Sequence, residues 1–187
     1  PGLIAVLGGA EYQRAVQSVD TGGAEWVTLT GVEYGLPSTG LAALSSDDVA
    51  AADAAHERVG PDTIVKFLLT SGSTGNPKAV ITTHRMLASN QATLLQAMPF
   101  LAEEPPVLVD WLPWNHVFGG SHNIGIVLMN GGTYYIDAGK PTPAGILETV
   151  RNLREISPTV YLNVPRGYEA LLPFLQTTPY RLPLDFH

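Results

Sequence analysis

The sequence predicts an α/β protein whose mostly parallel sheet carries helices on both faces. Short apolar runs bounded by glycine and proline alternate with stretches whose apolar residues recur at helical spacing. The 187 residues are enough for a sizeable core, and 45% hydrophobic with 14% charged content fits buried layers of secondary structure. Right-handed crossovers should join the parallel strands.

Each element follows from its own pattern, because apolar runs predict strands and apolar residues three and four apart predict helices. In chain order we expect a strand at 3–7, a helix at 11–19, a strand at 26–29, an irregular excursion at 31–44, a helix at 49–59, a strand from 64, a helix at 84–98, a strand at 107–112, a helix at 119–129, a strand at 133–136, a helix at 143–157, a strand at 160–164 and a helix from 165 to 175.

Capping residues support the helix boundaries. Ser46, Asp47 and Asp48 offer an N-cap and first-turn acids to the helix that starts at residue 49. Thr82 or Thr83 can cap the helix that starts near His84. The inward stripe expected on that second helix consists of Met86, Leu87, Asn90, Leu94 and Leu95.

The chain is expected to form one partial domain over residues 1–187, with an irregular tail at 177–187. A formal charge of -7 argues against nucleic acid or anionic lipid as a partner. The absence of cysteine agrees with a reducing compartment, and no signal peptide or membrane span is visible, so we expect a soluble cytoplasmic protein.

The stretch FLLTSGSTGNPKAV at 67–80 is the strongest functional signal. An apolar run stops at Thr70, and hydroxyls, two glycines and a lysine follow. Glycines allow close backbone approach, and successive amides form a concave nest for phosphate oxygens. The predicted nucleotide- or phosphate-binding residues are Thr70, Ser71, Gly72, Ser73, Thr74, Gly75, Asn76, Pro77 and Lys78.

Two other interpretations fit this stretch less well. Ser, Gly, Asn and Pro also dominate ordinary surface turns, but a solvated turn has no need of a lysine fixed behind a proline at the end of a buried strand. The P-loop of kinases and NTPases requires four residues between its first glycine and the Gly-Lys pair, and that spacing is not met here.

A second candidate site is WLPWNHVFGG at 111–120, at the carboxyl end of the strand that begins at Val107. Ligands of open α/β sheets lie outside the carboxyl ends of strands, so this stretch and the phosphate loop could face one site. His116 could hydrogen-bond a carboxylate or a ring substituent, with Trp114 and Phe118 as apolar walls. Taken alone, His116 is more often a packing residue, and Asp110 is either at a sheet edge or paired.

Both stretches resemble the adenylate-forming superfamily, which includes acyl-CoA and aryl-CoA synthetases, luciferases and peptide-synthetase adenylation domains. Its phosphate-loop pattern, roughly [ST]SG[ST]TGxPKxV, is met from Thr70 through Lys78 to Val80. Leu112, Pro113, His116, Phe118 and Gly119 match the family's LP..H.F/Y G stretch, which lines the acid pocket. Over residues 60–175 the chain resembles feruloyl-CoA synthetases in particular. The resemblance makes His116 and Phe118 substrate-binding residues, and His122, one helical turn beyond Phe118, could reach the same pocket.

The resemblance implies an ATP-dependent, AMP-forming acid-CoA ligase. A carboxylic acid such as ferulate would attack the α-phosphate of ATP, Mg²⁺ would bridge phosphate oxygens, and CoA would displace AMP. The family's downstream Thr-Glu, TGD and C-terminal lysine motifs do not occur here, so the resemblance supplies no complete catalytic set and no metal ligand.

Two hypotheses therefore stay open. Either the chain is part of the N-terminal domain of such a ligase, whose other partners are the rest of that domain and a C-terminal lid, or it is an incompetent fragment or pseudoenzyme that only binds nucleotide or pyrophosphate. In either case the chain alone should be inactive. A sheet cut short exposes an edge and an apolar face, so the chain could form a homodimer.

Overall fold

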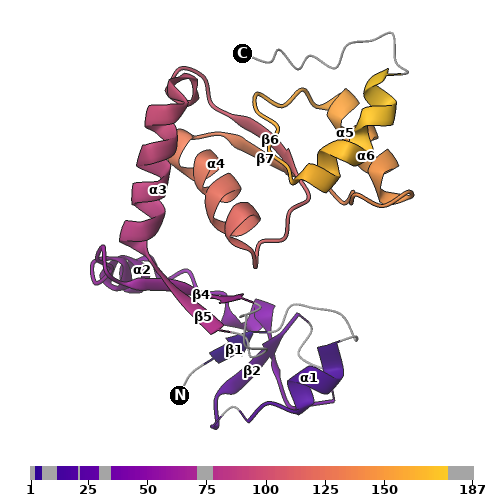
Figure 1. The fold of residues 1–187 in the computed structure, drawn as a ribbon. Helices are drawn as coiled ribbons and strands as arrows, with labels where there is room; N and C mark the ends of the chain where they lie inside the picture. Colours follow the sequence, from indigo (N-terminus) through magenta and orange to yellow (C-terminus); the bar gives the residue numbers. More distant parts are fainter. Residues whose placement is uncertain (1–2, 6–11, 21, 30–34, 71–77, 177–187) are drawn as a thin grey trace. The chain divides into compact units, whose positions relative to one another are not determined.

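The computed structural model describes residues 3–5, 12–20, 22–29, 35–70 and 78–176. The chain divides into two compact units, Pro1–Arg58 and Val59–His187, and each is described by itself. Figure 1 shows the elements of both units along the sequence. No helix among these residues has the length and apolar character needed to cross a membrane.

The first unit is built on a small parallel sheet with strand order β1, β2, β3. β1 (Leu3–Ala5) pairs with β2 (Glu25–Thr28), and β2 pairs with β3 (Thr39–Gly40). Helix α1 (Gln13–Gln17) provides the crossover between β1 and β2, as the sequence predicts. β3 lies inside the stretch for which an irregular excursion was predicted. Its two residues are too few to produce an apolar pattern.

Helix α2 (Val49–His56) closes this unit and begins where its cap predicts. The Asp48 carboxylate accepts a hydrogen bond from the backbone N–H of Ala51 at 2.9 Å. That bond satisfies one of the free amides of the first turn. A 3₁₀ helix over Leu41–Leu44 precedes it.

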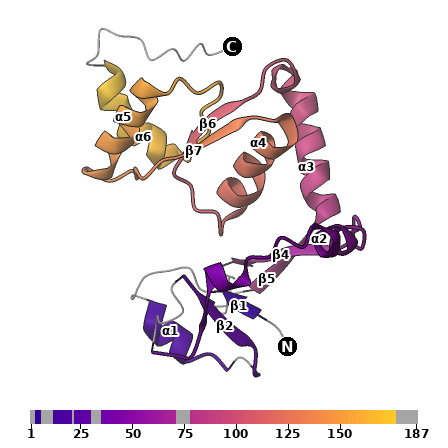
Figure 2. The ribbon, with the colours of Figure 1, turned by 180° about the vertical axis from the view of Figure 1, so that it is seen from behind.

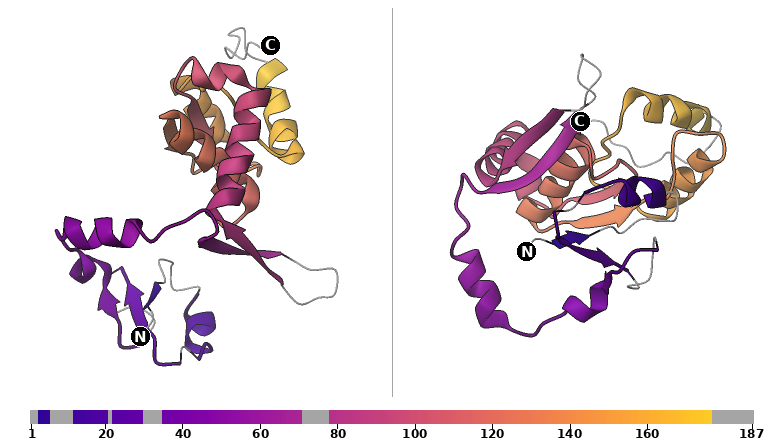
Figure 3. Two further views of the ribbon diagram at one scale, coloured as in Figure 1. Left: turned by 90° about the vertical axis from the view of Figure 1, so that its left-hand side faces the viewer. Right: turned by 90° about the horizontal axis from the view of Figure 1, so that it is seen from below.

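The second unit begins with an antiparallel hairpin that the sequence interpretation missed. β4 (Ile64–Thr70) pairs with β5 (Lys78–Thr83), and the register shifts by a β-bulge between Ile64 and Lys66. Figure 3 shows the hairpin as a two-stranded ribbon that continues into α3. β5 was overlooked because its six residues lie between the glycine-rich stretch and a helix cap, with no boundary signal of their own.

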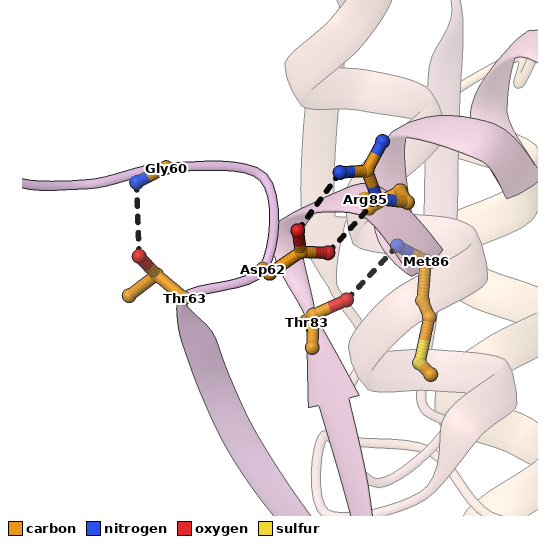
Figure 4. A network of polar contacts seen from close by, with 6 residues as sticks. All are labelled: Gly60, Asp62, Thr63, Thr83, Arg85 and Met86. Atoms are coloured by element: carbon orange, nitrogen blue, oxygen red, sulfur yellow. Dashed lines mark hydrogen bonds and ion pairs between the residues drawn. The ribbon is translucent and has the colours of Figure 1, made fainter.

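The base of the hairpin is fastened to the start of α3 (His84–Ala97). Thr83 caps the helix by accepting a hydrogen bond from the N–H of Met86, as predicted. The Arg85 guanidinium donates two hydrogen bonds to the Asp62 carboxylate, both 2.9 Å (Figure 4). Arg85 thereby lowers the pKa of Asp62. Both side chains are exposed, so the pair orients the hairpin more than it stabilises the fold.

The inward face of α3 differs from the predicted stripe. Gln91 is the buried residue of this helix, whereas Met86 and Asn90 are exposed. Leu94 and Met98 pack against a cluster formed by Leu101, Leu108, Ile126 and Val127. The predicted stripe is wrong at these positions because the prediction assumed apolar side chains on the buried face. The polar side chain of Gln91 occupies the centre of that face instead.

Two parallel strands and the helices around them form the rest of this unit. β6 (Val107–Asp110) and β7 (Thr133–Ile136) pair in register, and the bounds of β7 are those predicted. The helices are α4 (Ile124–Asn130), α5 (Gly145–Glu155) and α6 (Pro165–Gln176). Figures 1 and 2 show α3 and α4 on one side of the strands and α5 and α6 on the other.

Successive residues of β6 belong to different cores, which explains this layering. Leu108 packs with Ile126 of α4, whereas Val109 packs with Val150 of α5 and Leu171 of α6. Neighbouring strand residues point to opposite faces, so β6 has an apolar layer on each side. The predicted α/β class with parallel strands and flanking helices is confirmed.

The strand predicted at 160–164 is wrong. Thr159 donates its N–H to the carbonyl of Val107 at 2.9 Å, but no ladder continues beyond it. Side chains form the hydrogen bonds to these backbone groups instead. The Tyr168 hydroxyl donates to the carbonyl of Tyr161, and Asn163 Oδ1 accepts the N–H of Val164, both at 2.8 Å. An apolar run can therefore be irregular when local side chains satisfy its backbone.

Candidate active site

The predicted phosphate loop is flanked by the two paired ends of the hairpin. Thr70 ends β4, Lys78 starts β5, and the two residues lie directly opposite each other in the register. Opposite residues share a face, so the Thr70 hydroxyl and the Lys78 ammonium project from the same side. Both residues are exposed, and Thr70 Oγ1 donates to the carbonyl oxygen of Lys78 at 3.4 Å. The other predicted residues, Ser71, Gly72, Ser73, Thr74, Gly75, Asn76 and Pro77, lie outside the described residues.

A lysine that the sequence interpretation did not single out joins this hairpin to the second candidate site. Lys66 of β4 donates from Nζ to the carbonyl oxygen of Gly120. Partial burial lowers the pKa of the Lys66 ammonium. Residues 66, 68 and 70 share one face of β4, so Lys66 and Thr70 project from the same side. This bond ties the face that carries Thr70 to the 111–120 stretch.

The 111–120 stretch folds back on itself and enters a π-helix rather than the α-helix predicted there. The π-helix spans Phe118–Asn123 and continues into α4. His116 donates its N–H to Pro113 at 3.1 Å, and its own carbonyl accepts from Gly120 at 2.8 Å. π-helical turns are rare and occur frequently at functional sites.

Gly120 is required for this fold-back. A Cβ atom placed on it would lie 1.8 Å from the carbonyl oxygen of Trp114, a backbone atom that cannot rotate away. We expect Gly120→Ala to lower the free energy of unfolding by about 1–3 kcal/mol, as overpacked sites do. Urea denaturation followed by tryptophan fluorescence measures this. In the control Gly60→Ala, the nearest atom stands 4.0 Å from the new Cβ, and the effect should be small. Equal stabilities of the two variants would contradict this interpretation.

The π-helix brings two of the three predicted substrate-binding residues together. The rings of Phe118 and His122 meet edge to face, with centroids 5.3 Å apart. His122 Nδ1 lies 2.8 Å from Asn123 Oδ1. His116 precedes this pair, is exposed, and accepts the N–H of Phe118 on its Nδ1 at 3.2 Å. One short segment therefore presents two imidazoles and a phenyl ring.

Asp110, left open by the sequence, is buried and fully bonded. Its Oδ1 accepts the N–H of Leu112 at 2.8 Å, and its Oδ2 accepts from Asn123 Nδ2 and the Tyr134 hydroxyl, both at 2.7 Å. Burial raises the pKa of Tyr134, and the hydrogen bond from its hydroxyl to Asp110 raises it further. The phenol therefore stays a neutral donor. Asp110 thus connects the end of β6 to β7 and to the π-helix.

A second buried carboxylate follows β7. Asp137 accepts hydrogen bonds from Gly139 N–H at 2.8 Å, Thr149 Oγ1 at 2.6 Å and Asn152 Nδ2 at 2.9 Å. Its own N–H donates to the carbonyl of Asp110 at 2.9 Å. The carboxylates of Asp110 and Asp137, at the ends of β6 and β7, therefore accept hydrogen bonds that hold the fold together.

Comparison with known proteins decides the family. The AMP-binding enzyme family matches this chain over residues 10–183. The chain belongs to the AMP-binding enzyme family. The resemblance seen in the sequence is confirmed at this level, and the feruloyl-CoA synthetase subfamily stays a prediction.

Two curated relatives of this family member are fatty-acid ligases by name. The long-chain-fatty-acid–CoA ligase ACSBG2 of Gallus gallus is 30% identical over 117 residues, which are 59% of this chain and 14% of that protein. The medium-chain-fatty-acid acyl-carrier-protein ligase TtuA of Teredinibacter turnerae is 42% identical over 64 residues, or 34% of this chain and 10% of that protein. The chain thus spans a small part of the length of these relatives.

Solved structures of similar fold support the same architecture. ATP-bound MatB from Rhodopseudomonas palustris has a TM-score of 0.61 at 21% identity, over 96% of this chain and 32% of that one. A malonyl-CoA ligase complex with methylmalonyl-CoA and AMP has a TM-score of 0.57 at 24% identity, over 84% of this chain and 29% of that one. At these identities the likeness shows the fold alone.

Several residues that organise the candidate site were not found from the sequence. Lys66 carried a signal, since a charge interrupts an otherwise apolar strand. Gln91, Asn123 and Tyr134 carried none, because their partners lie on other elements. In the described part of the chain, no group of three or more His, Cys, Asp or Glu residues could hold a metal ion.

Proposed function

We propose that this chain supplies the phosphate-loop portion of an ATP-dependent, AMP-forming acid-CoA ligase. One observation carries the proposal. The chain belongs to the AMP-binding enzyme family, and Thr70 and Lys78 pair with each other on either side of the SGSTGNP sequence that connects β4 and β5. An ammonium and a hydroxyl on one face suit an anionic ligand that approaches this end of the hairpin.

In this proposal residues Thr70 to Lys78 hold the β- and γ-phosphates of ATP while an acid carboxylate attacks the α-phosphate. The bond between the α-phosphate and the bridging oxygen breaks, and pyrophosphate leaves with the negative charge. Lys78 stabilises that charge and forms no covalent bond. Bound Mg²⁺ would supply further charge neutralisation; it prefers oxygen ligands and phosphate, and the exposed Thr70 hydroxyl is one such oxygen. CoA would then displace AMP from the acyl-adenylate.

For the acid we propose a hydroxycinnamate such as ferulate, bound near His116, Phe118 and His122. The edge-to-face pair of Phe118 and His122 suits an aromatic ring, which could join it in the same geometry. The fatty-acid names of the relatives favour a different acid. Assays of the active ligase with ferulate and with a long-chain fatty acid as the substrate decide between these two acids.

A second candidate function is nucleotide or pyrophosphate binding without turnover. Continuation of the reading frame beyond His187 into Thr-Glu and TGD motifs would favour the ligase, and its absence would favour simple binding.

Hydroxamate trapping tests the two candidates on the 187-residue chain itself. With ferulate, ATP, Mg²⁺ and hydroxylamine we expect no ferulohydroxamate, because no motif for the ribose or for the adenylation lysine occurs in these residues. Calorimetry on the same sample should still detect pyrophosphate binding. Robust hydroxamate formation would show that these residues suffice for catalysis and would contradict our view. A chain that binds neither ATP nor pyrophosphate would remove the support for both candidates.

A further inference from the structure

Gln91 links helix α3 to the π-helix through its side-chain amide. It is 5% exposed, and its Nε2 donates to the backbone carbonyls of Ser121 and His122, each at 3.2 Å. α3 follows directly on β5, the strand that begins at Lys78. One side chain therefore connects the element that follows the phosphate loop with the segment that carries Phe118 and His122.

The orientation of this amide follows from chemistry. A primary amide nitrogen has two hydrogens, and its nearest acceptors are two backbone carbonyl oxygens at 3.2 Å, with Asn90 Oδ1 further away at 3.4 Å. The reversed amide would place an oxygen against both carbonyls and would be repulsive. Gln91 is thus a double donor to consecutive carbonyls of the π-helix. Among the described residues its Oε1 has no partner, so Gln91 is held in place by its nitrogen.

Gly125 supports the same arrangement from α4. A Cβ atom on Gly125 would lie 2.2 Å from Gln91 Nε2 and 2.7 Å from its Cδ. Glycine leaves the space that the amide occupies. A buried polar side chain and a matching glycine across two elements form a specific contact rather than general packing.

We propose that Gln91 is a positioning residue of the acid pocket: by donating to Ser121 and His122 it keeps the π-helical turn that holds the Phe118 and His122 rings together. Hydrogen bonds from outside a helix fix its register where the internal pattern departs from the α type. The role of these rings in acid binding rests on the proposed function. The role of Gln91 in holding the turn does not.

Hydrogen exchange on the 187-residue chain tests the positioning role without any turnover. Gln91→Met keeps the size of the side chain and removes both donors, and we expect amide exchange at residues 118–126 to rise roughly tenfold. Gln91→Glu replaces the donor with an acceptor facing two carbonyls, and should raise exchange further. The exposed Gln96 on the same helix offers the matched controls Gln96→Met and Gln96→Glu, which should leave exchange unchanged.

Uniformly faster exchange across α5 and α6 would mean general destabilisation and would overturn the proposal, as would unchanged exchange at 118–126 in both Gln91 variants. If Gln91→Glu fails to fold, Gln91→Met alone decides. In the active ligase, Gln91→Met should raise KM for the acid about tenfold and leave KM for ATP unchanged, whereas equal changes in both constants would count against a pocket role. A wild-type ligase without adenylate formation would disprove the proposed function, and the exchange result would still decide the role of Gln91.

Discussion

Asp110→Ala should lower the free energy of unfolding by about 3–5 kcal/mol. The substitution leaves three donors without their acceptor: the N–H of Leu112, the Asn123 amide and the Tyr134 hydroxyl. Each buried donor left unsatisfied costs about 1–3 kcal/mol. Burial raises the pKa of Tyr134, so its hydroxyl keeps its proton and remains a donor without an acceptor in the variant.

Urea denaturation with tryptophan fluorescence measures this loss, and two further variants bracket it. Asp110→Asn keeps the shape and one oxygen acceptor, and should lose about 1.5–3 kcal/mol, the value of a hydrogen bond to a charged group. Glu104→Ala removes an exposed carboxylate shortly before β6, and should change little. If Asp110→Ala were as stable as Glu104→Ala, the three-donor network could not be holding β6, β7 and the π-helix together.

Lys78→Ala should weaken binding of ATP and pyrophosphate by roughly 10–100-fold, equivalent to about 1.4–2.8 kcal/mol. Lys78 is exposed at the first position of β5, opposite Thr70, where its ammonium can reach a phosphate at the hairpin end. A charge-assisted hydrogen bond to phosphate has this strength. Because the attraction is electrostatic, the difference between wild type and variant should shrink as salt increases.

Isothermal titration calorimetry with pyrophosphate provides the measurement. Lys140→Ala removes another exposed lysine and serves as the control for net charge. Its affinity should match wild type. The proposed role of Lys78 would be lost if the two variants bound pyrophosphate equally well.

The layers of this fold could be predicted from local patterns, and its exceptions could not. The apolar runs at β6 and β7 and the caps at Asp48 and Thr83 are signals within a few residues of the elements that they define. The π-helix depends on a shift in hydrogen-bond register, which leaves no trace in the spacing of apolar residues. The irregular 160–164 run depends on side-chain bonds from Asn163 and Tyr168 that replace a strand ladder.

The candidate site divides in the same way. The phosphate-loop assignment rests on the contiguous chemistry of residues 70–78 and stays a prediction. The state of Asp110 could not be predicted, since its partners Asn123 and Tyr134 come from elements 13 and 24 residues further along the chain. The role of Gln91 could not be predicted for the same reason, because the two carbonyls to which it donates lie about 30 residues away along the chain.

The β-bulge near the start of β4 decides which way the hairpin's chemistry faces. Beyond it, Lys66, Leu68 and Thr70 share a side with Lys78, whereas Phe67, Leu69 and Ile81 occupy the exposed opposite side. Losing or gaining a single residue between Lys66 and Thr70, with the pairing of Lys66 to Thr82 kept, would exchange these two sides and turn Thr70 away from Lys78. Length changes in β4 should therefore be tolerated only in steps of two, which makes this strand a poor place for natural insertions and for engineered tags.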